Sequence, residues 1–143
     1  MANQAYMTRH ESRQEAFCLL FERTFTNMDI QEIIEGAEET RELTVSDFTL
    51  ELAKGTVEHM EEIDARIESK LRNWKLNRIS KVSLSILRMA VYELLYRDDI
   101  PANVTINEAV ELTKEYAAED EYSFVNGVLS AINKDQENKT EKE

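Results

Sequence analysis

The amino-acid sequence predicts an all-α fold, a compact bundle of about seven helices. Only three glycines and one proline occur among 143 residues, whereas strand-rich folds need many tight turns built from these two residue types. Apolar residues recur instead at steps of three and four, the spacing of one helix face. The length suits a single domain with its own core. We therefore expect one domain over residues 1–133 and a charged, disordered tail over residues 134–143, which lacks apolar residues.

The first two helices begin at recognisable caps. Thr8 and Glu11 have the spacing of a capping box, which satisfies free backbone amides at a helix start. An apolar stripe then runs over residues 16–25. Asp29 is a candidate cap for a second helix, whose shorter stripe covers residues 30–37.

A polar segment over residues 38–44 is predicted as a loop, and either Ser46 or Thr44 can cap the helix that follows it. The apolar face of this third helix is expected to run from Phe48 through Val57 and Met60 to Ile63. The pattern then continues into a fourth helical segment that ends near Leu71.

The fifth helix is expected at the centre of the bundle. Ser80 can cap it, and residues 82–95 are apolar on nearly all sides, which is typical of a buried helix. Pro101 ends the segment, because the residue before a proline avoids helical geometry. The residues expected to be buried here include Ile86, Met89, Ala90 and Leu94.

Two further helices complete the bundle. Thr105 and Glu108 have capping-box spacing, so a sixth helix is predicted to start there and to present apolar residues from Ile106 to Tyr116. The seventh helix carries its stripe over residues 124–132. Gly127 lies inside that helix, where it suggests a close crossing with a neighbouring helix.

The sequence argues against an enzyme, a metal protein and a membrane protein. No phosphate-binding glycine loop and no nucleophile with its base is present. His59 lies among glutamates without a second histidine at metal-ligand spacing. No apolar run approaches the roughly 18–20 residues that span a bilayer, and no signal peptide is visible. We expect a cytoplasmic protein without cofactors, with its single cysteine as a packing or interface residue.

Charge is distributed unevenly along the chain. The net charge is −12, which argues against a generic nucleic-acid binder. Residues 70–98, however, contain seven basic and two acidic side chains, so an acidic protein can still carry one basic face. The alternative interpretation of residues 70–98 is that their basic side chains form an ordinary solvated helix surface without a binding role.

Two short segments contain residues suited to RNA. Basic side chains at a helix start can meet phosphates. Aromatic rings can stack on unpaired bases, and carboxylates can accept from base amino groups. The alternative for the rings is a packing role. The candidates are Arg9, His10 and Arg13 at the first helix and Asp120, Tyr122, Ser123 and Phe124 at the last.

The order and spacing of several motifs, across three helices, resemble the core of the NusB family. The resemblance extends from about Thr8 to Ile132 and implies an all-helical fold of two packed bundles. The motifs that carry it are Arg78-Ile79-Ser80, Ile86-Leu87-Arg88-Met89-Ala90-Val91-Tyr92-Glu93-Leu94, Pro101, Ile106-Asn107-Glu108-Ala109-Val110-Glu111-Leu112 and Phe124-Val125-Asn126-Gly127-Val128-Leu129.

This resemblance implies a non-catalytic transcription antitermination factor. Such a protein pairs with NusE, a small-subunit ribosomal protein, binds the boxA element of nascent RNA, and reaches RNA polymerase and other Nus factors through that complex. The RNA contacts implied are residues 7–13 and 119–124. Some family members self-associate, so a homodimer is an open alternative. The NusE surface implied by the resemblance consists of Cys18, Phe21, Arg78, Val82 and Ser83.

Two departures from the family pattern bear on function. The dense N-terminal arginine run of the family is thin here, with Thr8 and His10 among its positions. Ser83 occupies a position that is commonly acidic. These departures favour weak RNA binding by the protein alone, and they leave a protein-interaction scaffold as the alternative function.

Overall fold

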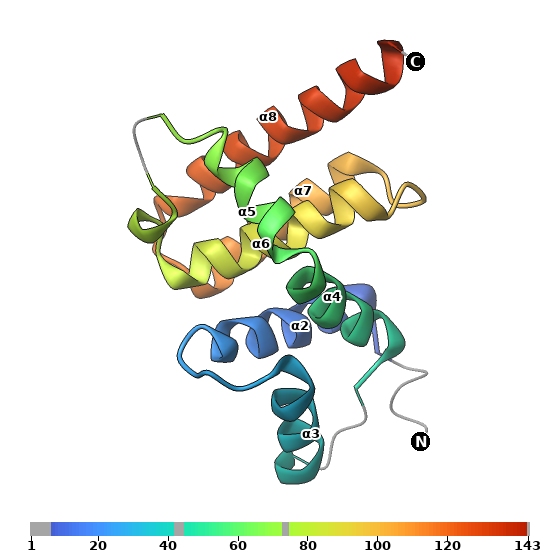
Figure 1. The fold of residues 1–143 in the computed structure, drawn as a ribbon, viewed down its shortest axis with the longest axis vertical. Helices are drawn as coiled ribbons and strands as arrows, with labels where there is room; N and C mark the ends of the chain where they lie inside the picture. The colour runs from blue at the N-terminus through green and yellow to red at the C-terminus, as the bar shows by residue number, and fades with distance from the viewer. Residues whose placement is uncertain (1–6, 42–44, 73–74, 143) are drawn as a thin grey trace. The chain divides into compact units, whose positions relative to one another are not determined.

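The computed structural model describes residues 7–41, 45–72 and 75–142. Within these ranges the chain forms seven α-helices, one short 3-10 helix and no strand. The prediction of an all-α fold is therefore confirmed. The chain divides into two compact units, Met1–Glu58 and His59–Glu143, which are described in turn (Figure 1). None of the described helices is both long enough and apolar enough to span a bilayer.

The first unit contains α2 (Arg9–Arg23), α3 (Ile30–Arg41) and α4 (Asp47–Glu58), and α2 packs against the other two. The capping box at the start of α2 forms as predicted, with the Thr8 N–H donating to Glu11 Oε1 at 2.9 Å and the Glu11 N–H donating to Thr8 Oγ1 at 3.0 Å. The core of this unit consists of Ala16, Phe17, Leu19, Leu20, Ile30, Ile33, Ile34, Ala37, Val45, Phe48, Leu52 and Ala53.

A buried cluster of hydroxyl groups fixes the start of α2 against the start of α4. Ser46 Oγ accepts the Thr49 N–H at 3.1 Å, which makes Ser46 the predicted cap; Thr44 lies outside the described residues. Ser46 and Ser12 share a hydrogen bond of 2.9 Å, and Thr49 Oγ1 donates to the Ser12 carbonyl at 3.0 Å. Each hydroxyl has a partner, so burial leaves none of them unsatisfied.

Two predictions for this part of the chain are wrong. The loop expected from residue 38 starts later, because α3 continues to Arg41. The helix expected from Phe48 to Ile63 is interrupted at His59, which has non-helical dihedral angles (φ −106°, ψ 20°). Met60, the first residue after this break, is only half-buried.

The second unit contains α5 (Met60–Glu68), a 3-10 helix η1 (Leu76–Arg78), α6 (Lys81–Tyr96), α7 (Ala102–Tyr116) and α8 (Glu121–Lys142). As predicted, α6 is central and packs against α5, α7 and α8. Ser80 caps it by accepting the Ser83 N–H at 3.1 Å. Leu94 is half-buried rather than buried. The buried residues of α6 are Ser83, Leu84, Ser85, Ile86, Leu87, Met89, Ala90, Val91, Tyr92 and Glu93.

The start of α7 differs from the prediction. The helix begins at Ala102, directly after Pro101, so Thr105 is not its cap. Pro101 occupies the N-cap position, with a non-helical ψ of 137°. Thr105 lies instead in the second turn, 2% exposed, and its hydroxyl donates to the buried carboxylate of Glu93 on α6 at 3.1 Å. The threonine therefore serves helix packing rather than helix initiation.

The last helix also extends beyond its predicted end. α8 continues through residues 134–142, where a disordered tail was predicted. Side chains of α5 and of the turn after it provide partners for this part of α8: Arg66 Nη1 donates to Gln136 Oε1 at 3.2 Å, and Lys70 pairs with Asp135. Gly127 does not mark a close helix crossing, because a Cβ placed there would meet no atom within 4 Å.

Candidate nucleic-acid interface

The start of α2 presents one basic side chain on an aromatic support. Arg9 is exposed, and its guanidinium carbon lies 3.9 Å from the centroid of the Phe48 ring on α4. A guanidinium over a ring face is held by a cation–π interaction while its N–H groups stay available to an anion. This geometry suits a phosphate contact.

The other residues predicted at this start are less accessible. Arg13 is 3% exposed, and its guanidinium carbon lies 5.3 Å from the same Phe48 ring. Of the two arginines, Arg9 is thus the one that reaches solvent. His10 is half-buried. Glu11 adds a negative charge beside them, since the hydrogen bond from the Thr8 backbone N–H lowers the pKa of its carboxyl.

The start of α8 presents the second predicted group. Asp120, Tyr122 and Ser123 are exposed, whereas Phe124 is half-buried. The Lys114 ammonium at the end of α7 lies 5.0 Å from the centroid of the Tyr122 ring. A positive charge beside a partly exposed ring suits a nucleotide, because the ring can stack on the base while the cation binds the phosphate. Sequence reasoning missed Lys114, because only the packing of α7 on α8 brings it to the tyrosine.

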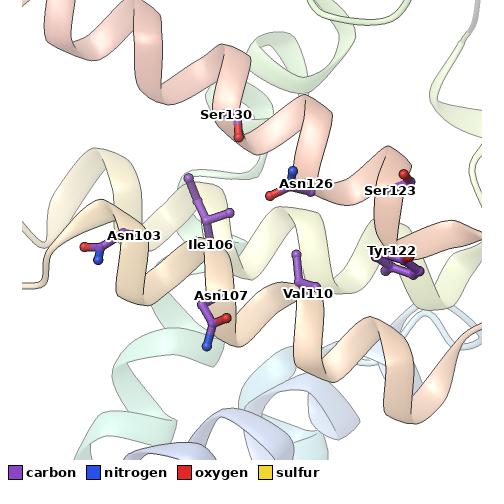
Figure 2. A pocket seen from close by; sticks show the side chains of 8 residues that line it. All are labelled: Asn103, Ile106, Asn107, Val110, Tyr122, Ser123, Asn126 and Ser130. Atoms are coloured by element: carbon purple, nitrogen blue, oxygen red, sulfur yellow. The ribbon is translucent and has the colours of Figure 1, made fainter.

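Tyr122 lies between two hollows of the second unit. One, of about 590 Å³, is bordered by Lys114, Ala117, Glu119 and Tyr122. The other is a groove of about 490 Å³ between α7 and α8, which Figure 2 shows from close by. None of the side chains that border this groove is charged. They are Asn103, Ile106, Asn107, Val110, Tyr122, Ser123, Asn126 and Ser130.

A carboxylate holds the start of α8 in place. Glu121 Oε1 accepts the hydroxyl groups of both Ser80 and Ser83 at 2.6 Å, and Glu121 Oε2 accepts the Ala118 N–H at 3.2 Å. The hydrogen bond from Ser80, followed by that from Ser83, lowers the pKa of Glu121. Sequence reasoning placed Glu121 in the segment expected to contact RNA and missed this structural role, because its hydroxyl partners lie 41 and 38 residues earlier.

The residues predicted to contact NusE differ in accessibility. Cys18 and Phe21 on α2 are half-buried, and Phe21 lies in a row of rings between Phe17 and Phe25, at 5.6 and 5.0 Å between centroids. Phe25, which was not among the predicted contacts, is 61% exposed. The surface formed by α2 and the turn after it is thus more apolar than the predicted residues alone indicate.

In the second unit, Arg78 is exposed and Val82 is half-buried. Ser83 is fully buried and donates to Glu121. This serine supports the neighbouring helix start and does not offer its side chain to a partner. No group of three or more histidine, cysteine or acidic residues that could hold a metal is found among the described residues.

Comparison with known proteins gives a consistent result. The model of the NusB family matches residues 10–134. The transcription antitermination protein NusB of Clostridium acetobutylicum is 45% identical over 134 residues, which cover 92% of this chain and 99% of that protein. The NusB protein of an Exiguobacterium species is 47% identical over 130 residues, which cover 90% of this chain and 99% of that protein.

Solved structures of NusB proteins have a similar fold. NusB of T. maritima superposes with a TM-score of 0.81 at 38% identity, covering 89% of this chain and 91% of that one. A chain from a structure of the antitermination factors NusB and NusE in complex with double-stranded RNA superposes with a TM-score of 0.79 at 32% identity. That match covers 88% of this chain and 96% of the other.

Proposed function

The chain belongs to the NusB family, and from this membership we propose that it acts in transcription antitermination by binding boxA RNA together with the ribosomal protein NusE. The observation that carries the proposal is the extent of the match. Similarity in sequence and in fold covers about nine-tenths of the chain, including a structure of NusB with NusE and RNA. The similarity therefore spans most of the chain and does not rest on one isolated motif.

The geometry of both predicted RNA segments supports this role. At the first, Phe48 holds the exposed guanidinium of Arg9 where a phosphate can reach it. At the second, the Tyr122 ring is 39% exposed beside Lys114 and can stack on an unpaired base. In this proposal the RNA contacts Arg9, His10, Asp120, Tyr122, Ser123 and Phe124. The buried Arg13 contributes indirectly, because its guanidinium packs near the Phe48 ring that also supports Arg9.

A partner is needed in this proposal because the chain itself is acidic. Phosphate contacts provide most RNA affinity, whereas the net charge is −12 and Arg13 is buried. NusE would dock on the apolar surface around Cys18 and Phe21 and on Arg78 and Val82, and would add basic surface. RNA polymerase and other Nus factors would then join the assembled complex.

The same charge favours a second candidate, a protein scaffold of the antitermination complex with little RNA affinity of its own. Titration of fluorescent single-stranded boxA RNA with the protein, with and without NusE, over a salt series distinguishes the two candidates. The proposed function predicts weak binding alone, tighter binding with NusE, and a steeper salt dependence for the pair. If NusE binds the chain but the RNA affinity of the pair equals that of NusE alone, the scaffold function is correct.

A further inference from the structure

The groove between α7 and α8 has an uncommon lining for this chain. Charged residues make up 32% of the sequence, yet all eight side chains bordering the groove are uncharged. Three are asparagines, namely Asn103, Asn107 and Asn126, and all three are exposed. A surface without carboxylates repels a polyanion less than the acidic surfaces of the same protein do.

The asparagines provide recognition chemistry. A side-chain amide offers two N–H donors and one carbonyl acceptor, which matches the paired donors and acceptors on the edge of a nucleobase. Among the described residues, these three amides form no hydrogen bond with the rest of the chain. Their hydrogen-bonding capacity is therefore available to a ligand.

The arrangement of the groove suits a short stretch of single strand. Tyr122, Asn126 and Ser130 follow one another at successive turns of α8, and Asn103 and Asn107 are one turn apart on α7 (Figure 2). The line from Tyr122 to Ser130 is roughly 12 Å long at about 1.5 Å per residue. Ile106 and Val110 lie between the two polar rows in Figure 2 and give the groove an apolar floor.

We propose that this groove binds unpaired bases of the RNA that continue from the base stacked on Tyr122, with Asn107 and Asn126 reading their edges. The inference rests on the proposed function, since Tyr122 belongs to both sites. It adds a subsite that is selective for bases rather than for phosphates. The groove volume of about 490 Å³ lies in the range of about 300–1,000 Å³ for small-ligand sites.

The test measures boxA RNA binding by the full chain with NusE. The double variant Asn107→Ala and Asn126→Ala should bind about 5- to 100-fold more weakly, the range expected when base-edge contacts are lost. Its salt dependence should equal that of the parent, because no phosphate contact is removed. Asn138→Ala, which removes an exposed amide elsewhere on α8, should bind like the parent. Circular dichroism of each variant checks folding.

Nuclear magnetic resonance provides a second readout that needs no substitution. In ¹⁵N-labelled protein, the side-chain amide signals of Asn103, Asn107 and Asn126 should shift when boxA RNA is added to the NusE-bound chain. A shift on addition of NusE alone, with no further change on adding RNA, would make the groove a protein-docking surface and overturn the inference.

The two proposals fail in different ways. If the parent binds boxA RNA with NusE and the double variant binds within about twofold of it, the groove carries no bases and the proposed function stands. If the parent and NusE bind no more RNA than NusE alone, both proposals fall together. Tyr122→Ala is the positive comparison, because under the proposed function the loss of stacking should weaken binding whether or not the groove holds bases.

Discussion

Replacing Glu121 by glutamine should loosen the start of α8. The carboxylate accepts three hydrogen bonds, from Ser80, Ser83 and the Ala118 N–H. The amide of glutamine has one acceptor oxygen and no charge, so it cannot replace all three. The segment affected contains Tyr122 and its neighbours, so RNA binding should fall together with stability.

The size of the effect follows from the exposure of the group. Hydrogen bonds to a charged group contribute about 1.5–3 kcal/mol each when shielded from water. Glu121 is only half-buried, and solvent screening reduces such contributions strongly. We therefore expect Glu121→Gln to lower the free energy of unfolding by about 1–2 kcal/mol at pH 7. This corresponds to a fall in melting temperature of about 3–6 °C for a chain of this size.

The pH dependence identifies the cause. Because the pKa of Glu121 in the folded protein is lowered from its usual 4.5, its stabilising effect is present above that value and is lost as the pH falls through the folded pKa. The stability difference between parent and variant should therefore be largest near pH 7 and should shrink below about pH 4. Urea unfolding, followed by circular dichroism at several pH values, measures it.

Glu119→Gln is the matched control, since it removes the same charge from an exposed position two residues earlier, in the loop before α8. It should change the unfolding free energy by less than about 0.5 kcal/mol. An effect of Glu121→Gln no larger than the control, or one that stays constant as the carboxyl is protonated, would refute the reasoning.

Three further predictions address the core and the RNA surface. Ile86→Ala should lower the unfolding free energy by about 2–5 kcal/mol in urea titrations, because the side chain is fully buried at the centre of α6; a loss below about 0.5 kcal/mol would contradict that position. Thr105→Val should lower it by about 1–3 kcal/mol, since it removes a donor from the buried Glu93 carboxylate; a neutral result would mean that other donors suffice. Arg9→Ala should flatten the salt slope of boxA binding with NusE by about one ion, whereas Arg13→Ala, at a buried site, should instead lower the melting temperature; equal slopes for parent and Arg9→Ala would remove Arg9 from the RNA surface.

Features set by neighbours in the sequence could be predicted from the sequence alone. The Thr8–Glu11 capping box and the Ser80 cap join groups three residues apart, so residue type and spacing suffice to recognise them. The all-helical class followed from periodicity in the same way. The central position of α6 followed from its apolar residues on nearly all sides, since such a helix is stable only when it is covered.

The same local reasoning misread residues whose role depends on a distant partner. Thr105 and Glu108 have the spacing of a cap, but Pro101 starts the helix earlier and Thr105 faces the carboxylate of Glu93. Arg13 has the composition of a phosphate ligand, yet packing against α4 buries it. Pro101 moves the helix start locally, and in both cases a tertiary contact then decides what the side chain does.

The candidate site shows the same division. Tyr122 and Arg9 could be proposed from the chemistry of their side chains, but the Lys114 ammonium beside the ring and the uncharged groove between α7 and α8 arise only when these helices pack. Glu121 is the clearest example, because the two serines that give it a role lie about forty residues earlier in the chain. Sequence determines which residues can cap, stack or carry charge, since these properties are local. Which of them meet is decided by helix packing, because burial of the shared apolar faces brings distant segments together.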